Sequence, residues 1–241
     1  MHNLDVILDE IKEHAYKCVP MECCGVVINF KGKLKYKPCN NKYPGINNFI
    51  LDPHDYVEAE DMGDVMYIVH SHVNQPAIFS EVDIACMNKG NIPWALYSIA
   101  EDKLVFREPS EVVIDYIGRT YSYTVQDCFT LIQDYYKQEY NIVLEGPPRD
   151  DPRDPLLGAG LYRQFLDYGF KEIALEELRK GDCLIICNSS SEPNHAAIYL
   201  EGNIILHHPH GRLSCREVLG NFWLKNTWKC VRHKNFINDN S

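Results

Sequence analysis

Apolar residues recur at helical spacing near the start of the chain. Leu4, Ile7, Ile11 and Ala15 fall on one face of residues 4–17, with charged residues between them. Such a stripe is typical of an amphipathic helix that packs one side against a core. We therefore predict a surface helix over this segment.

Residues 23–109 alternate between strand-like and helix-like patterns. Apolar runs on either side of Lys31-Gly32 predict a hairpin, and Asp52 followed by Pro53 is a typical helix start. The other predicted elements are a short strand at 47–52, a buried strand at 65–72, a helix at 80–90 and a hairpin of 93–100 with 102–109. This pattern favours a mixed sheet flanked by helices.

The second half of the chain has one long helix followed by several strands. Residues 111–124 form a bridging stretch, and the prolines and charges of residues 145–158 predict an exposed loop. The predicted elements are a helix at 127–140, helical segments at 162–170 and 173–181, strands at 183–187, 195–200 and 203–208, and a strand at 228–234 that closes the sheet. A helix packed on an antiparallel sheet, after the mixed first half, indicates the α+β class with two domains.

Composition excludes several classes of function. The 241 residues are 45% hydrophobic and 24% charged, as in ordinary globular domains, and a net charge of −10 disfavours nucleic acid as a partner. The apolar runs are far shorter than the roughly 20 residues of a membrane-spanning helix, so we expect no membrane insertion. The start of the chain lacks the pattern of a signal peptide, and we expect the protein to appear first in the cytoplasm.

The ten cysteines are irregularly spaced and form no CxxC pair. A thiolate zinc module is therefore disfavoured, and we expect most of these residues to be buried, reduced thiols. Cys128 stands apart because it begins a predicted helix.

The stretch HSHVNQPAIFSEVD combines two imidazoles, a hydroxyl and a carboxylate. Alternate strand residues share a face, so His70 and His72 point to the same side, and Asp83 in the next helix completes a zinc-binding set of three ligands. Glu22 supplies a general base for an attacking water, and Ser80 can hold the developing oxyanion. Simpler interpretations also fit the pattern: Ser80 and Asp83 form a capping box, and the histidines mark the end of a strand.

Glu22, the H-x-H pair and the S-x-x-D that follows seven residues later resemble the JAMM (MPN) metallopeptidases, which hydrolyse amide and isopeptide bonds. The resemblance covers residues 1–108 and implies a Zn²⁺ cofactor. Val73 and Phe79 stand where that family usually has proline, which affects the geometry of the loop more than the chemistry of the ligands.

Cys128 follows Asp127, a good N-cap, at the start of a strongly helical run. The helix dipole and a nearby imidazolium lower the pKa of a thiol in that position. His195 heads one predicted strand and His207 ends the next, so a nucleophile, a base and an orienting group are available. A buried, inert Cys128 and a surface metal cluster in the HHPH segment are the alternatives.

The segments YSYTVQDCFTLIQDYY, ELRKGDCLII, NHAAIYLEGN and ILHH resemble the NlpC family of papain-like cysteine peptidases, which cleave peptidoglycan stem peptides. The resemblance covers residues 115–235 and implies roles for Cys128 as nucleophile, His195 as base and His207 as the third polar residue. Tyr123 would assist the oxyanion site. Two departures are Phe129 after the nucleophile and Asn194 before the base, and both reshape the pocket.

A JAMM-like domain at 1–110 followed by an NlpC-like domain at 115–241 resembles the phage tail assembly proteins of the lambda K type. That resemblance implies a protein made in the host cytoplasm, recruited by other tail tip proteins to the virion tail tip, and able to open peptidoglycan stem peptides. Complete catalytic sets favour a hydrolase. A tail assembly or docking factor with one or both sites idle is the alternative.

Overall fold

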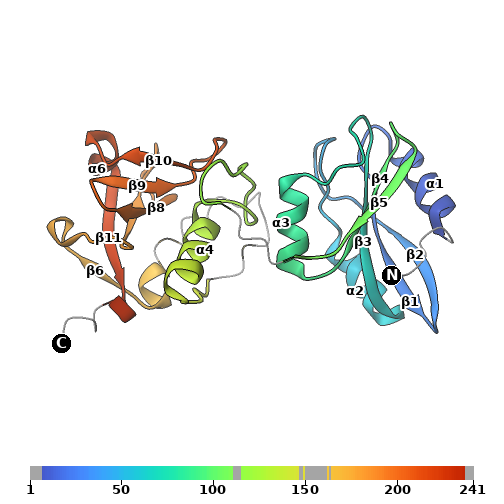
Figure 1. Ribbon diagram of the computed structural model, residues 1–241, viewed down its shortest axis with the longest axis horizontal. Helices are drawn as coiled ribbons and strands as arrows, with labels where there is room; N and C mark the ends of the chain where they lie inside the picture. Colours follow the sequence, from blue (N-terminus) through green and yellow to red (C-terminus); the bar gives the residue numbers. More distant parts are fainter. Residues whose placement is uncertain (1–6, 111–114, 147–148, 150–161, 163, 237–241) are drawn as a thin grey trace. The chain divides into compact units, whose positions relative to one another are not determined.

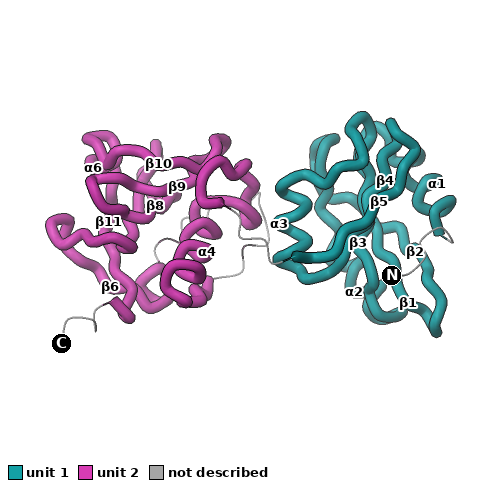
Figure 2. Tube along the Cα trace, viewed as in Figure 1, with its two compact units in different colours: residues 1–112 teal, residues 113–241 magenta. Residues whose placement is uncertain are grey.

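A computed structural model describes residues 7–110, 115–146, 149, 162 and 164–236 of the chain. The chain folds into two compact units, residues 1–112 and 113–241 (Figure 2). Each unit has its own sheet and its own hydrophobic core. Within the described residues, no helix has both the length and the apolar character that a membrane span requires.

The first unit is built on a five-stranded sheet in the order β2-β1-β3-β4-β5 (Figure 1). The strands are β1 Cys24–Phe30, β2 Lys33–Cys39, β3 Asp64–His72, β4 Trp94–Ser98 and β5 Lys103–Arg107. All neighbours are antiparallel except β3 and β4, which run parallel. A parallel pair needs a crossover connection, and helix α3, Glu81–Gly90, lies in that connection.

Two further helices of the first unit pack against opposite faces of this sheet. Helix α1, Leu8–Cys18, buries Ile11 and Ala15 in a cluster with Val27 and Val69. Helix α2, Pro53–Met62, buries Ala59 in a second cluster with Val26 and Ile28. The alternation of Val26, Val27 and Ile28 between the two clusters follows from the period of a strand.

The second unit has a six-stranded antiparallel sheet in the order β10-β9-β8-β7-β11-β6. The strands are β6 Phe170–Ile173, β7 Cys183–Ile186, β8 His195–Leu200, β9 Ile204–His207, β10 Cys215–Val218 and β11 Thr227–His233. Helix α4, Cys128–Tyr140, packs Ile132 and Tyr136 against Ile185 and Ile198. The short helix α6, Asn221–Asn226, belongs to a separate cluster with Leu184 and Ile205.

The α+β class and most of the predicted elements are confirmed. Both hairpins of the first unit, the helices α2, α3 and α4, and the strands β3, β7, β8 and β9 occur where the pattern placed them. Leu4 lies outside the described residues, and α1 begins at Leu8. All ten cysteines are free thiols.

The predicted strand at 47–52 is wrong. Only a single bridge joins Leu51 to Asn41. The Asn41 side chain accepts the backbone N–H groups of Tyr43 and Ile50, so these donors are satisfied within a loop instead of a ladder.

The helical segments predicted at 162–170 and 173–181 are only partly helical, because part of the region is strand or irregular. The described part of this region contains the 3-10 helix η2, Gln164–Tyr168, the strand β6 and the 3-10 turn η3, Leu175–Glu177. Gly169 has φ +89°, which ends the first turn and directs the chain into β6. Strand β11 lies between β7 and β6, so the prediction that it closes the sheet is wrong as well.

Two other predicted segments are only partly described. Residues 111–114 of the bridging stretch and most of the loop at 145–158 lie outside the described residues. In the described part of the bridging stretch, Ser122 pairs with Gln126 in an isolated bridge just before α4.

Candidate functional site

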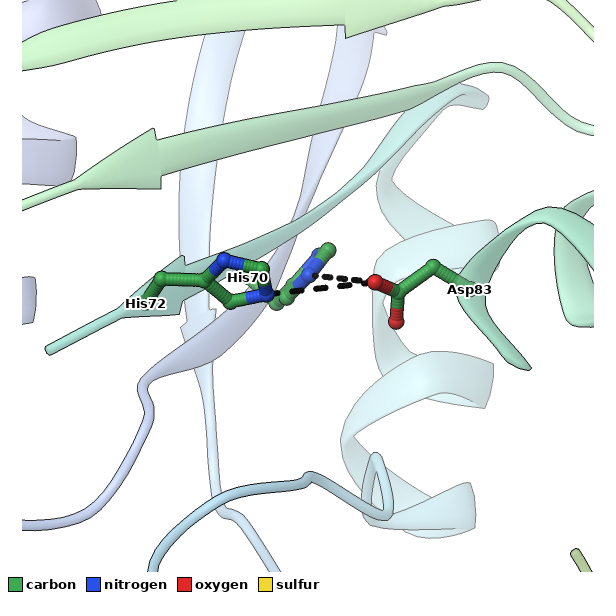
Figure 3. Close-up of side chains that lie close together, drawn as sticks. All are labelled: His70, His72 and Asp83. Atoms are coloured by element: carbon green, nitrogen blue, oxygen red, sulfur yellow. Dashed lines mark ion pairs between the residues drawn. The ribbon is translucent and has the colours of Figure 1, made fainter. Parts of the chain in front are cut away.

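The first cluster of candidate ligands lies where β3 faces α3. His70 and His72 alternate at the end of β3, and Asp83 lies in the first turn of α3. The Oδ2 atom of Asp83 is 3.5 Å from Nε2 of His70 and 3.8 Å from Nε2 of His72 (Figure 3). All three side chains are buried, so these residues form a compact set of two nitrogens and one carboxylate.

Helix α3 begins with the capping box that the sequence also allowed. The backbone N–H of Asp83 donates to Oγ of Ser80 over 3.1 Å, and the N–H of Ser80 donates to Oδ2 of Asp83 over 2.7 Å. The same carboxylate therefore caps the helix and faces the histidines. Burial opposes ionisation of Asp83, but attraction from His70 and hydrogen bonds from Ser80 outweigh it and lower its pKa.

Each histidine has a ring nitrogen whose lone pair can bind a metal ion. Nδ1 of His72 lies 3.0 Å from the carbonyl oxygen of Pro76, which can only accept, so Nδ1 carries the proton and Nε2 is free to coordinate. His70 stacks on Phe49 with 4.9 Å between the ring centroids. Within the described residues neither buried ring nitrogen of His70 makes a hydrogen bond, which is costly unless another partner supplies one. This donor set fits a zinc ion with one open position.

Glu22 lies two residues before β1 and is buried. Burial first, and the charge of Asp83 second, raise its pKa to about 8. Its position is fixed through Ser71, which lies between the two histidines: the N–H of Cys23 donates to Oγ of Ser71 over 2.9 Å, and the N–H of Ser71 donates to the carbonyl of Cys23 over 3.2 Å. Ser71 is a positioning residue that the sequence pattern did not reveal.

The second cluster lies at the start of α4. Asp127 is the N-cap, and its Oδ1 accepts the N–H groups of Phe129 and Thr130, each over 3.0 Å. Cys128 is the first residue of the helix and lines a cavity of about 80 Å³ that His195 also lines. The structure thus brings together the thiol and the imidazole that the sequence proposed.

His207 joins His195 across neighbouring strands. Nε2 of His195 lies 3.0 Å from Nδ1 of His207. The Trp223 ring packs against both imidazoles, with centroid distances of 5.9 Å and 4.7 Å respectively. Burial lowers the pKa of His195 to about 3 and that of His207 to about 4, so both rings are neutral at pH 7.

Tyrosines surround the thiol. The Tyr162 hydroxyl lies 2.8 Å from Sγ of Cys128, a contact that sequence analysis missed. Tyr123, the predicted oxyanion residue, lines the same cavity, and so does Tyr121. Burial first, and the charge of Asp127 second, raise the pKa of Cys128 to about 11, so the resting pair is a thiol beside a neutral imidazole.

The interpretation of the HHPH segment as a surface metal cluster is wrong. His207 and His208 are fully buried, whereas His210 is exposed. His208 and His210 pack against the Tyr121 ring at 5.3 Å and 4.8 Å and line the cavity beside Cys128. The segment therefore belongs to the wall of the thiol site.

Comparisons with known proteins divide the chain in the same way. Residues 5–113 match the prokaryotic homologs of the JAB domain, and residues 116–232 match the NlpC/P60 family. Tail tip assembly protein K of Escherichia phage N15 is 34% identical over 230 residues, which cover 94% of each chain. The protein of the same name from Escherichia phage lambda is 32% identical over 187 residues, which cover 76% of this chain and 89% of the other.

One solved structure is an NlpC/P60 family protein from Bacillus cereus. It has 15% sequence identity and a TM-score of 0.35, and the match covers 92% of this chain and 66% of the other.

Proposed function

Because the chain belongs to the family of phage tail tip assembly proteins K and joins a JAB-like domain to an NlpC/P60 domain, we propose that it acts at the tail tip as a cysteine peptidase on peptidoglycan stem peptides. In this role it is made in the host cytoplasm, binds other tail tip proteins and travels on the virion. The domain limits that we propose are residues 1–110 and 115–241.

The observation that carries this proposal is the shared cavity of Cys128 and His195, with His207 hydrogen-bonded behind the imidazole. Nε2 of His195 is engaged by His207, which leaves Nδ1 to accept the proton of the thiol. The sulfur then attacks the carbonyl carbon of the scissile amide, and the amine departs with the proton from His195. Water, activated by the same imidazole, releases the acyl group from sulfur.

The resting protonation states are compatible with this sequence of steps. A neutral His195 can act as a base at once, whereas an imidazolium could not. The backbone N–H of Cys128 at the first turn of α4, with the hydroxyl of Tyr123 or Tyr121 in the same cavity, can hydrogen-bond to the oxyanion. Tyr162 restrains Sγ of Cys128 before substrate enters.

In the JAB-like domain, His70, His72 and Asp83 would hold a zinc ion. Zinc bound there supplies a Lewis acid that polarises an amide carbonyl. Glu22, with its pKa raised to about 8, would take a proton from the attacking water and return it to the leaving amine. The Ser80 hydroxyl accepts the N–H of Asp83, and its own hydrogen can be donated to the substrate oxygen.

A second candidate function is assembly without catalysis, in which the two domains are docking surfaces and one or both sites are idle. The name of both relatives refers to tail tip assembly, and this favours such a role. Val73 and Phe79 stand where the JAMM family usually has proline. A catalytically inactive site is therefore more compatible with the JAB-like half than with the thiol half.

Incubation of the purified protein with defined muropeptides, with and without a chelator, tests the proposal. We expect a thiol-dependent cut within the stem peptide that persists when metal is removed. No cut with any stem peptide in either condition would favour the assembly role.

A further inference from the structure

A second group of potential metal ligands lies on the far side of His207 from His195. Cys215 is paired directly opposite His207 in the β9–β10 ladder, and Glu217 follows two residues later on the same face of β10. Sγ of Cys215 is 3.6 Å from Nε2 of His207. Oε2 of Glu217 is 3.7 Å from that nitrogen, and Oε1 of Glu217 is 3.8 Å from that sulfur. Three different donors therefore meet at one point.

These separations are close to those of a tetrahedral zinc site. Bonds of about 2.0–2.1 Å to nitrogen or oxygen and about 2.3 Å to sulfur place neighbouring ligand atoms roughly 3.3–3.6 Å apart. The sulfur–nitrogen distance of 3.6 Å already falls in this range. One ligand atom from each of the three residues lies within 4.8 Å of the others, so a rotation of the Glu217 carboxylate would bring one oxygen toward both partners. One sulfur, one imidazole nitrogen and one carboxylate oxygen are ligands that zinc accepts together, with a fourth position left open.

Neighbouring groups already orient two of the three donors. The Trp223 indole N–H donates to Oε2 of Glu217 over 3.1 Å, and Arg212 donates to Oε1 over 3.0 Å. Nδ1 of His207 is held by His195. Such contacts outside the ligands fix their direction and increase metal affinity.

An ion can reach this position from outside. Cys215 lines an open groove of about 530 Å³ together with Arg212 and Leu213, and both of these side chains are exposed. Cys215 is itself partly exposed, so an ion in this groove can reach its side chain.

We propose that His207, Cys215 and Glu217 form a zinc site that switches off the thiol site when it is filled. The proposed zinc binding is independent of the proposed function, whereas the switch rests on it. Zinc binding is linked to the thiol site by the position of one proton on the imidazole ring of His207 and one on that of His195.

Without the ion, the proton of His207 sits on Nε2 beside Glu217. Nδ1 then accepts from Nε2–H of His195, and Nδ1 of His195 keeps the lone pair that Cys128 needs. With zinc on Nε2, the neutral His207 ring must carry its proton on Nδ1 and donate it to Nε2 of His195. The proton of His195 moves to Nδ1, and Cys128 has no base.

Titration with Co²⁺, a spectroscopic substitute for zinc, tests the site itself. The JAB-like cluster has no sulfur, so a thiolate-to-cobalt absorption in the near ultraviolet reports only a site that contains cysteine. We expect this absorption in the wild type, in Asp83→Asn and in Cys128→Ala, and its loss in Cys215→Ser. Its persistence in Cys215→Ser, or its absence from the wild type, would overturn the site.

Zinc inhibition of muropeptide cleavage tests the switch. Each variant is compared with its own zinc-free rate, and we expect Cys215→Ser to need at least about tenfold more zinc for half-inhibition than the wild type. Equal inhibition of both proteins would overturn the switch. If the wild type cleaves no muropeptide, the proposed function fails, and the cobalt absorption still decides whether the metal site exists.

Discussion

Nε2 of His195 and Nδ1 of His207 lie 3.0 Å apart on the neighbouring strands β8 and β9. His207 is paired with Ala197, and His195 is two residues before that alanine, so the two imidazoles are diagonal neighbours on one face. Because His207 engages Nε2, Nδ1 is the nitrogen of His195 that is left for another partner. Several measurable consequences follow from this contact and from the JAB-like cluster.

Replacing the nucleophile should abolish cleavage. We expect Cys128→Ala to reduce muropeptide hydrolysis by at least about 10³-fold, because no other group can form the acyl intermediate. Circular dichroism and thermal unfolding should show that the fold persists. Cys86→Ala, which removes a half-buried thiol of the first unit, is the matched control and should keep wild-type activity. Unchanged activity in Cys128→Ala would reassign the nucleophile.

Loss of the orienting imidazole should lower the turnover number. In His207→Ala the tautomer of His195 is no longer fixed, and we expect kcat to fall about 10²-fold. His207→Asn should retain more activity than His207→Ala, because the amide oxygen can accept Nε2–H of His195. Steady-state kinetics on one muropeptide compare the three proteins. An alanine variant as active as the asparagine variant contradicts the orienting role.

The reactivity of Cys128 should rise steeply with pH. Its pKa is raised to about 11, so the thiol form dominates at neutral pH and the thiolate fraction grows about tenfold per pH unit up to that value. Alkylation by iodoacetamide, followed by mass spectrometry of the peptide that contains Cys128, should show this slope between pH 7 and 10. Denatured protein, with an ordinary thiol pKa of about 8.5, should level off earlier. Fast alkylation that is flat from pH 6 would indicate a thiolate–imidazolium pair instead.

Metal content should depend on the first pair of histidines. We expect the double variant His70→Ala, His72→Ala to lose one equivalent of zinc relative to the wild type, measured by elemental analysis after dialysis. His14→Ala, which changes a half-buried histidine of α1 outside every group of potential metal ligands among the described residues, is the control and should keep the wild-type content. Equal zinc in the double variant and the control would show that the JAB-like cluster holds no metal.

Variant phage particles can distinguish a catalytic role of the protein from a role in tail assembly. Phage that carry Cys128→Ala should assemble tails of normal appearance but inject DNA poorly, because the fold and its surfaces are kept while the chemistry is lost. Electron microscopy and a DNA-delivery assay measure the two properties. Absence of tails in this variant would contradict the separation, and normal delivery would favour an idle thiol site. Glu22→Gln tests the JAB-like half in the same way.

Local patterns were sufficient to predict the residues that share an element. The alternation of His70 and His72 on a strand, and the cap formed by Ser80 and Asp83, depend on periods of two and three residues within a short segment. The position of Cys128 at the start of α4 follows equally from its N-cap. These parts of both sites could therefore be predicted without knowledge of the sheet.

Contacts between strands were harder to foresee. Strand β10 is short and half-exposed at the edge of its sheet, with the sequence CREV, so it lacks the apolar alternation that marks a strand. Cys215 and Glu217 therefore gave no signal of their place beside His207. Tyr162 belongs to a segment whose helical pattern gave no sign of a contact with the thiol. Its contact with Cys128 depends on tertiary packing that no local period encodes.

The carboxylate of Asp83 has two roles, because it caps the first turn of α3 and completes the histidine cluster. A related protein whose cluster bound no metal would still need this aspartate to cap the helix. His70 has no comparable capping role, because the described residues give its ring nitrogens no hydrogen bond. Among relatives of this protein, replacement of His70 is therefore a clearer sign than replacement of Asp83 that the cluster binds no metal.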